Sequence, residues 1–288
     1  MKRILVPTDF SECAGMATEL AASIARKNDA RLFLMHIIQI PSYESNTSIE
    51  TYQDVAEGLF LMKLVKQKFK DLLAKPYLKD VNVIEVIQFD SVYESVSKQA
   101  KEQDIDLIVM GSHGATGAQE IIVGSNAERI IRTSTVPVLT VKNRHMNFAP
   151  KNIVFASNFY GESTRNFDSI KSFAKMFNSK IHLLKVNTPN QFETTKFSEK
   201  LMADFVEKTG ITNYSANICN EESVESGIHY YCDKMGADLI AMETHGRTGI
   251  AHFLAGSVAE GVVNHTQLPV LSMKISKDKT PEGVIFPE

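Results

Sequence analysis

The chain has 288 residues, which is long for one hydrophobic core and sufficient for one large barrel or for two domains of about 140 residues. A hydrophobic content of 43% with 23% charged residues is too apolar for a disordered chain, and the sequence is not repetitive enough for a fibrous protein. With 31 basic and 34 acidic residues, the net charge of -3 argues against binding of nucleic acid by the whole chain, although it does not test a local basic patch.

The N-terminal residues and the cysteines indicate the cellular compartment of the protein. The apolar run before Pro7, Ile4–Val6, has only three residues and is too short for a signal peptide. No stretch approaches the ~20 consecutive apolar residues that cross a bilayer. Cys13, Cys219 and Cys232 lie far apart without a C-x-x-C pair, which predicts neither a disulfide framework nor a metal site. We therefore expect a cytoplasmic protein that contacts no membrane.

The sequence repeats itself once. Residues 106–141 begin DLIVMGSHG and residues 238–273, 132 positions later, begin DLIAMETHG. Two upstream segments match at an offset of 149 positions: 2–10 with 151–159, and 31–38 with 180–187. The change of offset from 149 to 132 means that the second copy lacks 17 residues between these blocks. A period of this length predicts two duplicated domains rather than a solenoid of short repeats.

Short apolar runs alternate with amphipathic segments in the first copy. Runs rich in β-branched residues predict five strands: Ile4–Val6, Leu32–Ile38, Val81–Ile87, Ile105–Met110 and Val136–Val141. Apolar residues at three- and four-residue spacing predict helices over Met16–Ile24, Val55–Leu72, Val92–Ala100 and Ala127–Ile131. The alternation predicts an α/β fold, a doubly wound parallel sheet with helices on both faces. A single β/α barrel is the alternative, but two copies supply ten strands where a barrel needs eight.

We expect one domain over residues 1–143 and a second over 150–275. The stretch Lys142–Pro150 is polar and ends in proline, as linkers often do. A polar tail from Ser276 would lie outside the second core. The additional residues of the first copy, at about 41–60, would form either a flap near a ligand or a docking surface.

Two loops of the first copy have a composition that suits a ligand site, because ligands of open parallel sheets bind at the carboxyl ends of the strands. In the loop after the first strand, Asp9 with Glu12 can form a capping box, and this loop alone indicates no more than a helix cap. The loop after the fourth strand is rich in glycine and ends at Gly124-Ser125, where a helix begins and where backbone amides attract phosphate. Ser125 with Glu128 can also form a capping box, so a well-capped helix is the alternative. Neither a Walker A motif nor G-x-G-x-x-G occurs.

The spacing Gly111-x2-Gly114-x9-Gly124-Ser125 resembles the ATP-binding motif of the universal stress proteins. The sequence Pro7-Thr8-Asp9 is similar to the adenosine-side loop of that family. The resemblance covers both halves of the chain, as in tandem-domain members. It implies two adenine nucleotide alpha hydrolase-like domains with the strand order 3-2-1-4-5, which would bring the loops at Asp9 and Gly111 together.

The resemblance also implies which residues of the first domain hold ATP, alone or with Mg²⁺. From the adenine end to the phosphate tail they are Pro7, Thr8, Asp9, Ile37, Met110, Gly111, Gly114, Gly124, Ser125 and Asn126. His113 is a further candidate for phosphate or a divalent ion, but its copy His245 persists in the altered half, which favours a structural role for both. His36 and His182 lack metal-ligand spacing and are expected to be packed or surface residues. No catalytic residue and no metal ligand is predicted.

The second copy departs from the motif at two positions. Asn158 replaces Asp9, and Glu243 replaces Gly111 and adds bulk and negative charge where a triphosphate must approach. Gly246, Gly256 and Ser257 persist. We interpret this domain as a pseudo-twofold partner whose motif has drifted; an altered second ligand site is the alternative.

These observations predict a cytoplasmic ATP-binding protein of the stress response, whose nucleotide state biases its association with other proteins. A slow ATP hydrolase or another nucleotide-dependent enzyme is the first alternative, although no nucleophile elbow and no H-E-x-x-H motif occurs. A nucleotide-free interaction module is the second. Dimeric relatives associate through their fifth strand, so the resemblance implies that Val136–Val141 and Leu268–Met273 pair within the chain. A homodimer and unidentified protein partners are compatible with this arrangement.

Overall fold

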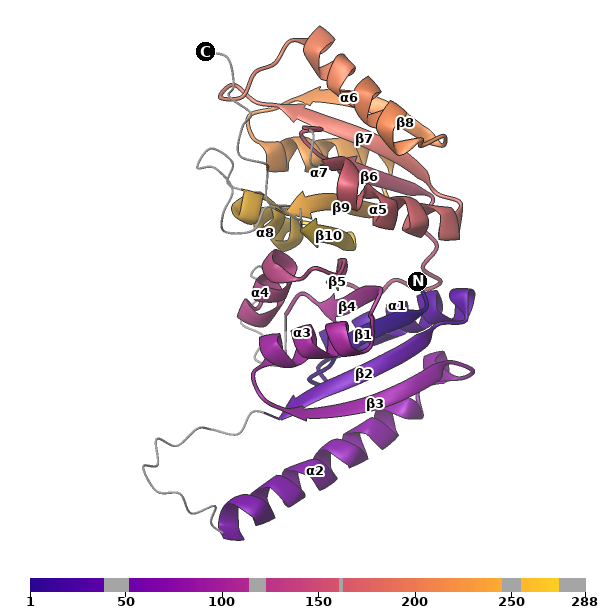
Figure 1. Cartoon of the computed structure of the whole chain (residues 1–288), viewed down its shortest axis with the longest axis vertical. Helices are drawn as coiled ribbons and strands as arrows, with labels where there is room; N and C mark the ends of the chain where they lie inside the picture. The colour runs from indigo at the N-terminus through magenta and orange to yellow at the C-terminus, as the bar shows by residue number, and fades with distance from the viewer. Residues whose placement is uncertain (39–51, 114–122, 161–162, 245–254, 275–288) are drawn as a thin grey trace.

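Figure 1 shows a computed structural model of the whole chain. The structure describes residues 1–38, 52–113, 123–160, 163–244 and 255–274. The expected tail from Ser276, most of the glycine loop that contains Gly114, and the part of the expected insertion before Tyr52 lie outside the described residues.

Within the described residues, each half of the chain supplies five strands. Those of the first half are β1 (Arg3–Pro7), β2 (Arg31–Ile38), β3 (Asn82–Phe89), β4 (Leu107–Gly111) and β5 (Val138–Val141). Those of the second half are β6 (Asn152–Ala156), β7 (Lys180–Asn187), β8 (Tyr214–Asn220), β9 (Leu239–Thr244) and β10 (Val270–Lys274). The five strands predicted for the first half are confirmed to within a few residues.

The helices follow the same duplication. The first half contains α1 (Glu12–Asn28), α2 (Tyr52–Leu73), a 3-10 turn at Pro76–Leu78, α3 (Val92–Glu102) and α4 (Ser125–Thr133). The second half contains α5 (Ser163–Phe177), α6 (Thr195–Thr209), α7 (Val224–Met235) and α8 (Ala255–His265). α2 has 22 residues and its counterpart α6 has 15, so the difference in copy length falls between the second and third strands.

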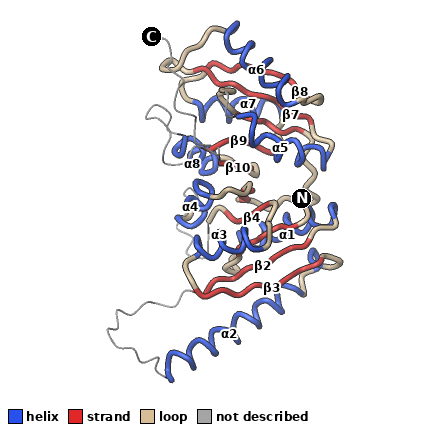
Figure 2. The backbone as a smooth tube through the Cα atoms, viewed as in Figure 1, coloured by secondary structure: helices blue, strands red, loops and turns tan. Residues whose placement is uncertain are grey.

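The ten strands form one continuous sheet in the order β3-β2-β1-β4-β5-β10-β9-β6-β7-β8, as labelled in Figure 1; Figure 2 shows the strands in red. Each half has the order 3-2-1-4-5 and all of its strands are parallel. The halves meet where β5 and β10 pair antiparallel, with Leu139 opposite Leu271. The doubly wound fold and the pairing of the two fifth strands are thus confirmed, and an open sheet of ten strands excludes the barrel.

Helices cover both faces of the sheet, and each face has a hydrophobic core that extends through both halves. On one face, Phe69 of α2 and Phe205 of α6 belong to the same buried cluster. On the other face, Ile130 of α4 and Val262 of α8 share a second cluster. Figure 1 shows α4 and α8 side by side where the halves meet. None of the described helices is long and apolar enough to cross a membrane.

The segment Lys142–Pro150 is more than a polar spacer. Phe148 is buried, and its ring packs against the rings of Phe173 and Phe177 at centroid distances of 6.4 and 5.6 Å. Arg144 forms an ion pair of 2.7 Å with Glu19 of α1. The connection therefore packs against both halves, which the linker composition did not predict.

Candidate functional site

A cavity of about 410 Å³ opens at the carboxyl ends of β1 and β4 in the first half. It is lined by every predicted site residue that the structure describes: Pro7, Thr8, Asp9, Ile37, Met110, Gly111, His113, Gly124, Ser125 and Asn126. Its wall also includes Ala14, His36, Val92, Ser112 and Ala127. Because β1 and β4 are neighbours in the sheet, loops about a hundred residues apart in sequence meet at this point.

The loop after β1 has an unusual backbone conformation. Phe10 has φ = 63°, a left-handed conformation that is costly for a bulky side chain. Two side chains support the turn: Thr8 Oγ1 accepts the Phe10 N–H at 3.0 Å, and Asp9 Oδ1 accepts the Ser11 N–H at 2.9 Å. The capping box expected from Asp9 and Glu12 is wrong, because Ser11 caps α1 and accepts the Ala14 N–H at 3.2 Å. Asp9 instead holds the turn and lines the cavity.

The glycine at the end of β4 is required by close packing. A Cβ atom at Gly111 would lie 2.7 Å from Cys13 Sγ and 3.1 Å from the Cys13 carbonyl carbon. After it, the Ser112 N–H bonds Val141 O at 3.0 Å, and Ser112 O accepts the Gly124 N–H at 2.8 Å. The last bond brings the start of α4 back to the end of β4.

Helix α4 begins at the cavity with glycine as its N-cap residue. The expected capping box of Ser125 and Glu128 is wrong, because Ser125 is already the first helical residue and Glu128 pairs with Arg132 at 3.3 Å. Gly124 has no side chain with which to cap the helix. A helix start of this kind leaves first-turn N–H groups for another acceptor, and its dipole favours an anion.

His36 is a cavity residue that the sequence did not predict. Its Nδ1 lies 2.7 Å from Thr8 O, and its ring is 4.7 Å from that of Phe10. Burial lowers the pKa of His36 below its ordinary value of 6.5, which favours the neutral imidazole at neutral pH. His113, by contrast, also lines the cavity and contacts its neighbour Ser112, with 2.8 Å between Nδ1 and Oγ. His182, which was expected to be a packed or a surface residue, is buried and contacts Ser215 and Asn152.

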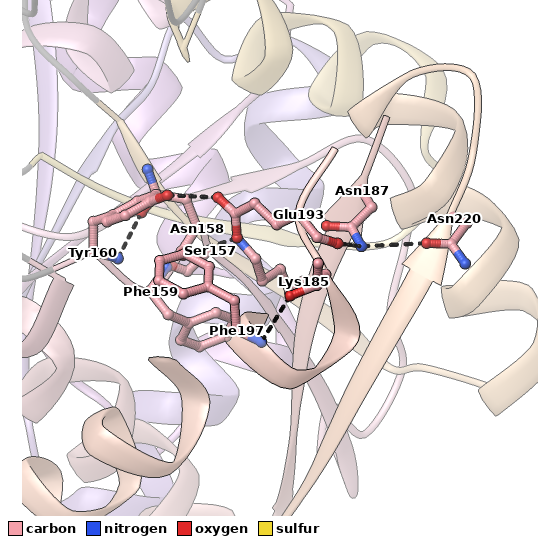
Figure 3. A network of polar contacts seen from close by, with 10 residues as sticks. Ser157, Asn158, Phe159, Tyr160, Lys185, Asn187, Glu193, Phe197 and Asn220 are labelled. Atoms are coloured by element: carbon pink, nitrogen blue, oxygen red, sulfur yellow. Dashed lines mark hydrogen bonds and ion pairs between the residues drawn. The ribbon is translucent and has the colours of Figure 1, made fainter. Parts of the chain in front are cut away.

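The corresponding cavity of the second half is smaller, about 100 Å³, and contains an ion pair (Figure 3). Lys185 of β7 is 4% exposed, and its Nζ lies 3.0 Å from Glu193 Oε2. The same Nζ donates to the carbonyl oxygen of Asn158 at 3.2 Å, and the Tyr160 hydroxyl donates to Glu193 Oε1 at 2.5 Å. Burial, together with the Glu193 carboxylate, raises the pKa of Tyr160 to about 12. We call Lys185, Glu193 and Tyr160 the charged plug.

The two substitutions in the second motif have different structural consequences. Asn158 preserves the turn, since its Oδ1 accepts the Tyr160 N–H at 3.0 Å and Phe159 has φ = 62°, as Phe10 does. Only the negative charge of Asp9 is lost there. Glu243, however, places a buried carboxylate in the cavity wall, where it accepts a hydrogen bond of 3.0 Å from Ser157 Oγ.

The three cysteines are free thiols. In the described ranges, no cluster of three His, Cys, Asp or Glu side chains is arranged to hold a metal ion.

Comparison with known proteins agrees with this architecture. The profile of the universal stress protein family matches residues 1–142 and again residues 150–274. The chain belongs to the universal stress protein family. It is therefore a tandem universal stress protein, with two copies of the family domain in one chain.

Similar proteins include single-domain and full-length relatives. Universal stress protein MJ0577 of Methanocaldococcus jannaschii is 31% identical over 159 residues, which cover 50% of this chain and 96% of the relative. Universal stress protein Slr1230 of Synechocystis is 22% identical over 291 residues and is covered completely, together with 95% of this chain. The crystal structure of a universal stress protein from Archaeoglobus fulgidus shares the fold with a TM-score of 0.67 at 18% identity, covering 95% of this chain and 98% of that one.

Proposed function

We propose that this universal stress protein binds ATP, with or without Mg²⁺, in the cavity of its first domain. The observation that carries the proposal is the convergence of two separate loops and the start of α4 on one cavity of about 410 Å³. Thr8 and Asp9 would receive the nucleoside, and the start of α4 at Gly124, Ser125 and Asn126 would receive the phosphates. Gly111, which packs against Cys13 of α1, would keep the end of β4 beside the ligand.

The second domain would not bind a nucleotide. Its cavity is about one quarter of that volume (100 against 410 Å³), and the charged plug and Glu243 line it. A buried carboxylate opposes a triphosphate by like-charge repulsion. In this proposal, the first domain responds to ATP and the second domain serves as its permanent partner.

We further propose a cytoplasmic role in the stress response, in which the nucleotide state of the first domain biases association with other proteins. The expected surface at about 41–60 is described only from Tyr52, at the start of α2. Leu59 and Phe60 on this helix are 57% and 60% exposed, and apolar exposure of this kind supports a docking role over a flap.

Isothermal titration of the full chain with ATP and Mg²⁺ tests the nucleotide site. We expect one ATP per chain, loss of binding in Gly124→Glu, and retention of binding in the matched second-domain variant Gly256→Glu. At a ligand concentration of 100 times Kd, binding should add about 2.7 kcal/mol to the free energy of unfolding. Two sites per chain, or unchanged binding in Gly124→Glu, would contradict the assignment. Saturable release of phosphate during the same incubation would favour the hydrolase alternative.

A further inference from the structure

A hydrogen bond crosses from the second domain to the loop that precedes α4. The backbone N–H of Val123 donates to Asn264 Oδ1 of α8 at 2.6 Å. Asn264 is held in turn by its own carbonyl oxygen, which accepts a bond of 2.9 Å from Lys142 Nζ. Val123 directly precedes Gly124, the N-cap residue of α4. A side chain of one domain is thus bonded to the backbone at the candidate phosphate site of the other.

This bond helps to hold the two residues that directly precede helix α4. Val123 is 6% exposed, so its N–H requires a partner within the protein. The next N–H, that of Gly124, bonds Ser112 O at 2.8 Å within the first domain. Two successive amides are therefore held from two directions, one by Ser112, which follows β4 of the first domain, and one by α8 of the second. Together they orient the first turn of α4.

The duplication does not reproduce this contact. In the repeat, Asn264 corresponds to Arg132, which lies 132 positions earlier. A guanidinium group has only donors and cannot accept a bond from a backbone N–H. Arg132 pairs instead with Glu128 of its own helix at 3.3 Å. The acceptor, Asn264, therefore lies in the second domain and faces the first domain, which has the complete motif.

We propose that Asn264 of the second domain is a positioning residue for the phosphate-binding turn of the first domain. By holding the Val123 amide, it keeps the N-terminus of α4 in the orientation that receives the phosphates of the nucleotide. The proposal rests on the proposed function, and it makes the second domain part of the nucleotide site.

The test compares ATP and adenosine binding by the full chain. Asn264→Leu removes the acceptor at similar volume, and Asn264→Asp retains it. Gln267→Leu is the matched control, because Gln267 accepts its hydrogen bond from Asn143, where the domains meet, and not from Val123. We expect Asn264→Leu to weaken ATP binding about 5- to 30-fold, the factor that corresponds to about 1–2 kcal/mol for one buried hydrogen bond. Adenosine binding should change less than about twofold. Asn264→Asp retains the acceptor but adds a negative charge beside the phosphates, so it is read by amide exchange, where Val123 should stay protected as in the wild type.

Amide hydrogen exchange without nucleotide provides a second measurement. Exchange at Val123 should accelerate in Asn264→Leu and remain at the wild-type rate in Gln267→Leu. Wild-type ATP affinity in Asn264→Leu, or equal losses for ATP and adenosine, would overturn the positioning role. If the wild-type chain itself binds no ATP, the proposed function fails and this role fails with it. If the wild type binds ATP and Asn264→Leu binds it equally well, only the positioning role fails and the proposed function stands.

Discussion

The charged plug of the second domain leads to a quantitative prediction about Lys185→Met. The Lys185 side chain is 5% exposed and that of Glu193 is 20% exposed, so the pair is largely withdrawn from water. Removing one partner of a buried ion pair costs about 3–5 kcal/mol, because the other charge remains buried without its counterion. Glu193 keeps the Tyr160 hydrogen bond and some contact with solvent. We therefore expect a smaller loss of about 2–3 kcal/mol.

Urea unfolding followed by circular dichroism measures this loss in Lys185→Met, Glu193→Gln and the double variant. The double variant removes both charges, so it should be more stable than the sum of the single losses predicts, by at least about 1 kcal/mol. Asp168→Asn is the matched control, since it breaks the exposed ion pair with Lys171 and should change stability by less than about 0.5 kcal/mol. A loss below about 0.5 kcal/mol in Lys185→Met, or additive single losses, would refute the reasoning.

Four further predictions follow from single residues. Gly111→Ala should destabilise by about 1–3 kcal/mol in thermal unfolding, because its Cβ would lie 2.7 Å from Cys13 Sγ. Gly15→Ala should instead stabilise α1 by about 0.5–1 kcal/mol, since nothing lies within 4 Å of its Cβ. The pKa of His36 is lower in the folded chain than in the unfolded chain, so the unfolded chain binds a proton at a higher pH as the pH falls. The free energy of unfolding therefore has its full His36 contribution above pH 6.5 and loses it as the pH falls below that value. The Tm of the wild type should therefore decrease more than the Tm of His36→Gln when the pH is lowered from 7.5 to about 5. Glu243→Gly should leave the ATP stoichiometry unchanged, because the charged plug still lines that cavity.

Much of the fold could be predicted because strands of a buried parallel sheet are short, apolar and rich in β-branched residues. The internal repeat located the additional residues between the second and third strands, where α2 is longer than α6. The strand order came from the family resemblance, since periodicity alone does not define which strands are neighbours. Phe148 shows the opposite case: one aromatic residue in a polar stretch gives no sign that it is buried.

The candidate site was predicted in its loops but not in its details. Asp9 and Ser11 are both good N-cap residues, and the left-handed conformation of Phe10, which selects Ser11, leaves no mark in the sequence. His36 precedes Ile37 at the end of β2, and this proximity to a predicted site residue was the one available signal. The charged plug joins residues from two loops and a strand, and such a meeting depends on tertiary packing.

The antiparallel pairing of β5 with β10 restricts how the protein can respond to a ligand. Domains joined only by a linker can rotate about a hinge, and many proteins signal through that motion. Here the hydrogen bonds of one sheet and two shared cores connect the domains, so a rigid-body rotation would have to break all of them together. In the proposed function, a bound nucleotide would therefore act on other molecules only through the loops and helix ends above the strands, while the sheet beneath them stays fixed.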